Sequence, residues 1–445
     1  MNVTKIHQII PRKLPGLLFV LLMIIALLGL VGCGGSGQTG SSGPLPAPSA
    51  PAVLQGYLGT QGAQYGSIGG VWQMSLNDTG HTYNIPLSSD LVQDGTGTTT
   101  LSNSVLQLAG VDAGNIGYAV EIPGRAVLYR PCGPNESTQT APVIFVAQGA
   151  CLNLNSTATF QFVQLPDMRW NPATDWAYGS VQTSTSGTQW SFSNLSLFTQ
   201  SGNSVQAPAM LPAVCGASKN GNLISSLPDT ANNIPATTIG VGPTGFFFAD
   251  ASLNSVPNGP GQSGTYLVSA LPAKVGVIQP ASALDTSAVM AAKYTGLLFE
   301  PCPSTSNGIS CGEGGNANDL MTKLVAFVPG SSGALIGGGF PSSFSASGGI
   351  AFDLTQSPAN NVGIMLGSQD SKNNGLYKTA LATLPDPNSL CLSTTGAAGK
   401  DTGGNPTCTV PAVAVVGNPE GKYAIFLIAE DLLTSRPLGI YLYQQ

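Results

Sequence analysis

Charged side chains are scarce in this sequence. Asp, Glu, Lys and Arg make up 8% of the 445 residues, against about 25% in ordinary soluble domains. Three of the 15 Lys and Arg residues precede position 33, which leaves 12 basic against 21 acidic side chains, a net charge of −9 for the remainder. Phosphate backbones attract proteins with clustered cations. We therefore expect no nucleic-acid partner.

Histidine is almost missing. The chain has 2 histidines, and only His81 lies beyond the first 32 residues. A Ser-His-Asp or Cys-His mechanism would have to use this residue, yet it follows a turn and opens a returning strand, where an exposed side chain is expected. The sequence therefore designates no catalytic residue.

Metal-ligand patterns are lacking too. No C-x-x-C pair accompanies the single remaining histidine, as a zinc site would require. The stretch from Asp370 to Gly375 matches half of a calcium loop, but Lys372 takes the third position and Leu381 the twelfth, where a bidentate glutamate is needed. A hairpin explains this stretch better. We predict no metal site and no cofactor.

What the chain does have at its start is a signal peptide. A basic beginning with Lys5, Arg12 and Lys13 precedes an apolar run from Leu17 to Val31. This run of 15 residues is shorter than the roughly 20 residues that cross a bilayer as a helix. Residues 1–32 are therefore expected to be removed, and the alternative is a retained transmembrane anchor.

The end of this signal carries a recognisable motif. Leu30-Val31-Gly32-Cys33 resembles the lipobox of bacterial lipoproteins. The resemblance implies cleavage before Cys33, acylation of its sulfur and new amino terminus, and a membrane as partner through this lipid anchor. Two or three acyl chains hold a protein stably on a membrane. Gly34 stands where enterobacterial lipoproteins retained at the inner membrane have Asp, which favours the outer membrane where both exist.

A linker follows the cysteine. Residues 34–52 are rich in Gly and Ser and then in Pro, without periodic apolar residues. As a flexible coil, such a stretch spans about 24 Å. We interpret residues 33–55 as the lipidated cysteine and a tether that separates the rest of the chain from the membrane.

Seven cysteines remain after Cys33. In an oxidising envelope, we expect local pairs that each close a loop rich in Gly, Ser or Asn. The alternative is that the thiols stay reduced. The pairing leaves Cys215 single, and the predicted pairs are Cys132 with Cys151, Cys302 with Cys311, and Cys391 with Cys408.

The remainder predicts an all-β fold. Short apolar runs alternate with Gly- and Asn-rich turns, as in the hairpin from Val71 to Leu87 around Asn77–Gly80 and the hairpin around residues 372–375. Helical periodicity is confined to stretches such as 285–293. These patterns predict β-barrel or β-sandwich units. A single β-propeller is the alternative.

Two echoes in the sequence suggest a duplication. Residues 128–132 recur as residues 298–302, and residues 234–247 recur in pattern as residues 410–423. From these nearly equal offsets we predict two tandem units, 56–270 and 271–445. A chance match of β-rich sequence is the alternative.

One aromatic cluster stands out, and it holds three of the chain's 4 tryptophans. Exposed aromatic rings stack on sugars, whereas buried rings build a core. The cluster therefore predicts either a ligand-binding face or the core of the first unit. Its members are Trp170, Trp176, Tyr178 and Trp190.

The chain as a whole resembles uncharacterised lipoproteins of soil bacteria in its lipobox, tether and low-charge β body. We predict a membrane-anchored envelope protein with a non-enzymatic binding or scaffolding role. An envelope protein or a glycan is the partner expected. The alternatives are a glycan-binding module that uses Trp170, Trp176 and Trp190, and a hydrolase of envelope polymers.

Overall fold

The computed structural model describes the parts of the chain that carry its secondary structure. Residues 44–445 form one compact unit. Within the described part, every helix is too short or too polar to cross a membrane. The described residues are 55–60, 71–77, 80–85, 95–110, 114–131, 143–147, 157–164, 177–186, 189–199, 213–215, 223–226, 238–241, 245–249, 252–257, 265–271, 274–301, 320–331, 333–345, 349–386, 391, 396–401, 403–430 and 437–445.

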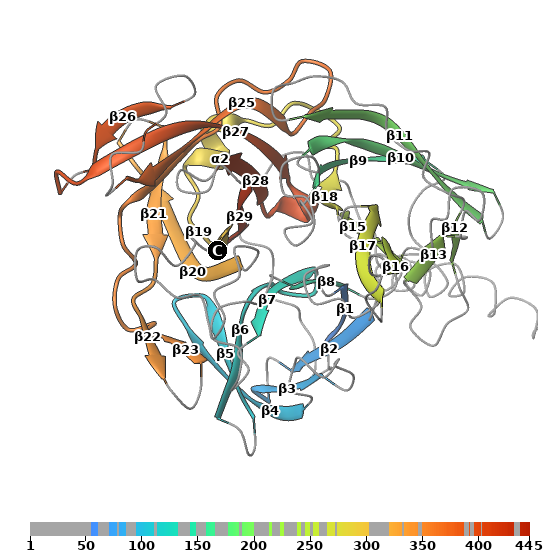
Figure 1. The fold of residues 1–445 in the computed structure, drawn as a ribbon, viewed down its shortest axis with the longest axis horizontal. Coiled ribbons are helices and arrows are strands. Elements are labelled where there is room, and N and C mark those ends of the chain that lie inside the picture. The colour runs from blue at the N-terminus through green and yellow to red at the C-terminus, as the bar shows by residue number, and fades with distance from the viewer. Residues whose placement is uncertain are drawn as a thin grey trace, which may run out of the picture. The chain divides into compact units, whose positions relative to one another are not determined.

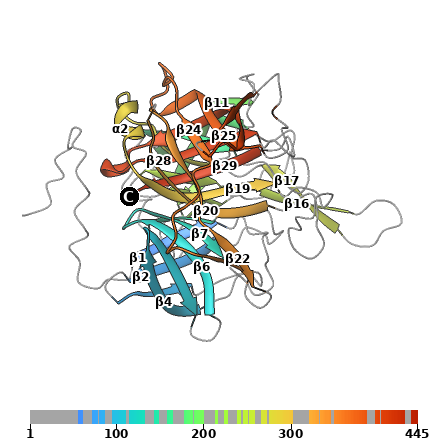
Figure 2. The ribbon, with the colours of Figure 1, turned by 90° about the vertical axis from the view of Figure 1, so that its left-hand side faces the viewer.

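The first sheet is a closed barrel. Each of its eight strands pairs antiparallel with the next, and β8 pairs back with β1 (Figure 1, blue to cyan). Figure 2 shows several of these strands from the side. The expected first hairpin is present, because β2 pairs with β3 across the turn at Gly80. The strands are β1 (Gln55–Thr60), β2 (Val71–Asn77), β3 (Thr82–Ile85), β4 (Gly95–Ser102), β5 (Val105–Gly110), β6 (Gly114–Ile122), β7 (Ala126–Pro131) and β8 (Val143–Ala147).

The second sheet is also a closed barrel of eight strands, with β18 pairing back to β9. A two-stranded hairpin lies between its last two strands in the sequence and stays outside the ring. The ring comprises β9 (Thr157–Gln164), β10 (Ala177–Ser186), β11 (Gln189–Thr199), β12 (Ala213–Cys215), β13 (Leu223–Ser226), β14 (Thr238–Val241), β15 (Phe246–Ala249) and β18 (Lys274–Ile278), and the hairpin comprises β16 (Ser252–Pro257) and β17 (Thr265–Leu271).

The third sheet has nine strands. Because β25 pairs with both β24 and β27, eight of them close into a ring, and β26 pairs with β27 outside it. We call this ring the third barrel. It comprises β19 (Tyr294–Pro301), β20 (Leu320–Pro329), β21 (Leu335–Gly339), β24 (Val362–Met365), β25 (Leu376–Pro385), β27 (Pro406–Gly417), β28 (Ala424–Glu430) and β29 (Pro437–Gln444); β26 is Ala397–Lys400, and β22 (Ser342–Ser345) pairs separately with β23 (Gly349–Phe352).

Both ends of the third barrel are filled. The helix α2 (Thr286–Met290) begins at Asp285, whose side chain accepts a hydrogen bond from the Ser287 amide, and it buries Val289 and Met290. This helix confirms the expectation for residues 285–293. At the other end of the barrel, Leu384 near the end of β25 lies opposite Cys408 near the start of β27, and both belong to the same interior cluster as the helix residues. The interior is therefore a packed core, as is usual for eight strands.

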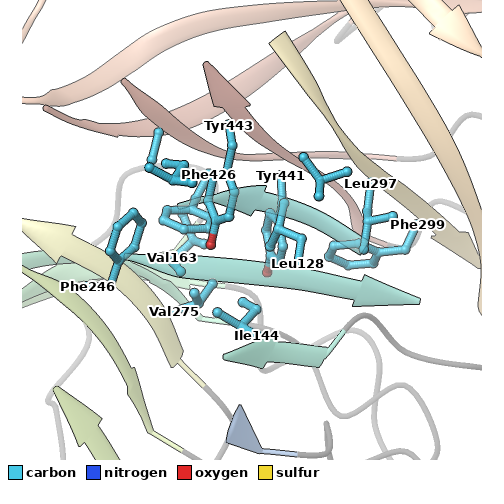
Figure 3. Packing of buried hydrophobic residues seen from close by; sticks show 14 of the residues in the cluster. Leu128, Ile144, Val163, Phe246, Val275, Leu297, Phe299, Phe426, Tyr441 and Tyr443 are labelled. Carbon is cyan, nitrogen blue, oxygen red and sulfur yellow. The ribbon is translucent and has the colours of Figure 1, made fainter. Parts of the chain in front are cut away.

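Successive side chains along a strand point alternately into the barrel and out of it, and the outward ones hold the barrels together. Tyr129 points into the first barrel, whereas its neighbour Leu128 points outward into a second cluster. In β29, Leu442 points inward and Tyr443 outward in the same way. Buried outward residues from all three barrels together form one shared core (Figure 3). Strands such as β7 and β29 are therefore buried on both faces, and their sequences are mostly apolar, with Arg130 and Gln444 as the polar members.

Glycine permits close approach where two of the rings close. Gly276 of β18 lies opposite Phe162 of β9, and a Cβ at this position would overlap the Gln161 carbonyl oxygen. Gly296 of β19 lies opposite Leu442 of β29, and a Cβ there would overlap the Tyr441 carbonyl oxygen. Each position is where the first and last strands of a barrel meet, so the absence of a side chain allows the ring to close.

The all-β class and the barrel architecture are confirmed. The propeller alternative is wrong, because the strands close into rings rather than separate blades. The division predicted at 270/271 does not coincide with a sheet boundary. Residues 56–270 contain the first barrel and seven of the eight strands of the second, and β18 lies beyond them.

The echoes in the sequence relate to the rings in different ways. The echo at 128–132 and 298–302 joins β7, a seventh strand, to β19, a first strand, so the two copies are not equivalent. The echo at 234–247 and 410–423 spans the turn between the sixth and seventh strands of the second and third barrels. The recurring structural unit is a single eight-stranded ring, shorter than the offset between the echoes.

Candidate functional site

The aromatic cluster does not form one described surface. Tyr178 is 3% exposed and belongs to the shared core, so its ring does not face solvent. The backbone of Trp190 pairs with Thr185, seven positions along β10 from Tyr178, a separation of roughly 23 Å. Trp170 and Trp176 lie outside the described residues. For Tyr178, the core alternative is therefore the correct one.

One predicted disulfide is present. Cys391 and Cys408 are bonded, with Cα atoms 5.3 Å apart, and they fasten the segment after β25 to β27. The nearby carboxylate of Asp386, which is 3% exposed, accepts a hydrogen bond from the Cys391 amide at 2.9 Å. Cys33, Cys132, Cys151, Cys302 and Cys311 lie outside the described residues, and Cys215 ends β12.

Thiol alkylation tests this disulfide. In the denatured but unreduced protein, Cys391 and Cys408 are expected to resist iodoacetamide and to appear in one linked peptide, because neither carries a free thiol. Peptide mapping before and after reduction measures this. Modification of Cys391 before reduction contradicts the bond, and Cys215, predicted to be single, serves as the reactive control.

Polar residues that could serve in catalysis or metal binding lie in turns. His81 is exposed, with φ of 49°. Asp401 accepts hydrogen bonds from Gly403 and Asn405, which lower the pKa of its carboxyl. Asp370 accepts from the Lys372 and Asn373 amides, in the turn between β24 and β25. Across the described segments, no three potential ligands gather around a metal position.

Hydroxyl groups surround α2 at one end of the third barrel. The Tyr294 hydroxyl donates to the Val289 carbonyl at 2.7 Å, and the Tyr377 and Thr286 hydroxyls are hydrogen-bonded at 3.1 Å. Burial raises the pKa of Tyr294 and Tyr377. Since these hydroxyls hold the helix, the arrangement positions α2 as a plug.

A buried cation links the first and third barrels. Arg130 of β7 is 1% exposed, and its Nε donates to the Thr322 carbonyl of β20 at 2.9 Å. Its guanidinium lies 5.3 Å from the ring centre of Phe352, and the Phe352 amide donates to the Tyr118 hydroxyl at 2.8 Å. A segment that leaves the third barrel after β21 is thus clasped by the first barrel. The clasp couples two barrels and leaves Arg130 inaccessible to a ligand.

The exposed feature that distinguishes the body is apolar. Val328 is 44% and Met365 40% exposed, and Pro411 is also exposed, while Ile336 and Leu381 are half-buried. Strand register makes them neighbours on the outer face of the third barrel: Val328 lies opposite Ile336, and Leu381 lies opposite both Met365 and Pro411. We call these five residues the apolar band.

The band lies within two cross-strand rows that contain no charge. The longer row runs from Val328 through Ile336 and Gly363 to Thr383 and Thr409. The shorter row consists of Met365, Leu381 and Pro411. The two threonine hydroxyls bond to each other at 2.8 Å. Sequence reasoning missed this surface, although a signal was present: β21, β24 and the second half of β20, from Leu324 onward, consist only of apolar residues and glycine on both faces.

Buried tyrosines predict a loss of stability in alkali. Burial raises the pKa of Tyr83 to about 12, and it also raises the pKa values of Tyr441 and Tyr443. Unfolded tyrosines lose their protons near pH ~10, so between pH ~10 and ~12 the unfolded chain binds fewer protons and folding stability falls as pH rises. Urea unfolding at increasing pH measures this. Tyr83→Phe should reduce the slope, and a flat profile would contradict the prediction.

No protein-family model matches the chain, and no curated protein matches it. Among solved structures, the chain is similar to the crystal structure of a mutant of the vaccine antigen Transferrin Binding Protein B from Haemophilus parasuis Hp5. The similarity covers 89% of this chain and 76% of that chain, at 9% sequence identity and a TM-score of 0.23. A TM-score this low carries no argument about fold or function.

Proposed function

We propose that this protein is a lipid-anchored protein of the bacterial cell envelope whose β body has a non-enzymatic binding or scaffolding role. The observation that carries the proposal is the order of segments at the start of the chain. A basic and apolar signal ends in Cys33, a Gly/Ser/Pro tether follows, and the first described strand of the β body begins at Gln55.

The shape of the body supports binding through a surface. Packed clusters of buried side chains occupy the interiors of the first and third barrels and leave little room there for a ligand, and the shared core holds the three rings to one another. A partner therefore meets outward-facing side chains. The apolar band is an exposed part of that surface without a charged side chain, and we take it as the candidate contact surface.

The expected address is the outer membrane where the organism has one, because Gly34 follows the lipidated cysteine. The tether of about 24 Å allows the body to stand clear of the headgroups. The net charge of −9 beyond residue 32 disfavours close contact with anionic lipid. An envelope protein fits these properties as a partner.

Metabolic labelling with a palmitate analogue tests the anchor. The wild type is expected to incorporate label and to fractionate with membranes, and globomycin, which inhibits the lipoprotein signal peptidase, should leave the precursor unprocessed. Cys33→Ser should lose the label completely, because the acylated sulfur is gone. Cys215→Ser is the matched control and should label like the wild type. A wild type without label contradicts the proposal.

A further inference from the structure

We infer that the apolar band is a self-association surface, and that its occupant is the same band on a second copy of this chain. The inference rests on the proposed binding role, and its test in solution does not depend on the lipid anchor. The outer face of the third barrel is apolar where the other barrels cover it, and it is also apolar at the band, where solvent reaches it.

Along β20 and β27 the covered and open parts are continuous. On β20, outward residues pass from Leu324, fully buried, through Ala326, partly buried, to Val328, 44% exposed. On β27 they pass from Val415 and Val413, both in the shared core, to exposed Pro411. The band therefore extends an interface that this barrel already makes with other eight-stranded rings of the chain.

The chemistry of the rows suits contact with an identical face. None of their eight residues carries a charge, so pairing two copies buries no ion. The Thr383 and Thr409 hydroxyls already bond to each other at 2.8 Å, which lowers the cost of removing them from water. A two-fold contact requires a self-complementary patch, and a patch of small and medium apolar residues can pack against an identical one.

A lipid surface fits less well. Proteins that lie on membranes place basic and aromatic side chains around the apolar patch. The two rows contain neither kind of residue. The acidic charge of the body also opposes approach to anionic headgroups.

The size of the band sets the strength of association. The longer row crosses five strands and the shorter row crosses three, so together they cover at most about 20 Å by about 10 Å, far below the roughly 800 Å² per partner of a stable interface. The dimer is therefore weak and reversible in dilute solution. Confinement of lipid-anchored copies to one membrane raises their effective concentration, which makes a weak contact sufficient.

Sedimentation equilibrium of the body from Pro44 onward tests the inference. This part is one compact unit that contains the described strands and α2. At high concentration it is expected to show a monomer–dimer equilibrium. Val328→Lys and Met365→Lys should each weaken dimerisation by about tenfold or more, because an ammonium group would be buried without a partner. Both sites are at least 40% exposed, so circular dichroism should report an unchanged fold.

Leu101→Lys is the matched control. Leu101 is 65% exposed on the first barrel, outside the band, and its substitution should leave the dimer unchanged. A monomer at every concentration overturns the inference, as does a dimer that tolerates both band substitutions. Binding to phosphatidylcholine vesicles that Val328→Lys abolishes, without self-association, assigns the band to lipid and also overturns it. Since the body lacks Cys33, none of these outcomes depends on lipidation.

Discussion

Replacing Phe426 with alanine is expected to lower the free energy of unfolding by about 3–5 kcal/mol, the usual cost of deleting a buried phenylalanine ring. Phe426 is fully buried in the shared core. Its ring lies edge-on to Tyr441 at 5.1 Å and to Phe246 of the second barrel at 6.5 Å. The cavity cannot collapse without moving strands of two barrels. Urea unfolding followed by circular dichroism and tryptophan fluorescence measures the loss.

Tyr441→Phe is the control for this experiment. It keeps the ring and removes a buried hydroxyl that has no hydrogen-bond partner among the described residues, so stability should stay the same or rise by about 1 kcal/mol. Because the barrels share a core, both probes should report one transition that Phe426→Ala shifts as a whole. Wild-type stability of Phe426→Ala, or separation of the two probes, would contradict the shared core.

Gly296→Ala is expected to destabilise the protein by about 3 kcal/mol or more, at the upper end of what overpacking costs. The new methyl group would overlap the Tyr441 carbonyl oxygen, and a backbone atom cannot move aside as a flexible side chain can. Relief requires β19 and β29 to separate, which opens the third barrel. Thermal unfolding and amide hydrogen exchange of β29 measure the effect.

Gly339→Ala tests the same change without the overlap. Gly339 belongs to β21 of the same ring, and the nearest atom to a Cβ there is the Leu324 carbonyl oxygen at 3.8 Å, an ordinary contact. Its cost should stay below about 1 kcal/mol. Equal losses for the two variants would show that close approach of the strands at Gly296 does not hold the ring closed.

Local features of the fold were predictable from the sequence. The hairpin at Asn77–Gly80, the helix near Asp285 and the bond between Cys391 and Cys408 each depend on residues close in the chain. Ring closure depends on pairs such as β9 with β18, more than 100 positions apart. Alternating apolar residues do not specify such partners, and the outer hairpin strand β17 has the same kind of sequence as a ring strand. The number of rings was therefore not predictable.

The apolar band was not predictable from the sequence for a related reason. A strand with apolar residues on both faces is normally buried on both, and β24 has the sequence of such a strand. Only the register shows that its outward face, at Met365, stays open while the outward faces of β28 and β29 are covered. The tryptophan cluster was a stronger signal in the sequence, yet Tyr178 within it serves the core.

The double burial of β28 has a consequence for folding. Residues 424–429 are all buried, alternately in the third barrel and in the shared core, and none is charged. Until β27 and β29 pair with it, this segment is an unpaired strand that is apolar on both faces. Exposed apolar strands of this kind promote intermolecular aggregation. The newly made chain therefore depends on holding chaperones or on rapid ring closure. Overproduction should give inclusion bodies, even though the finished protein hides the segment completely.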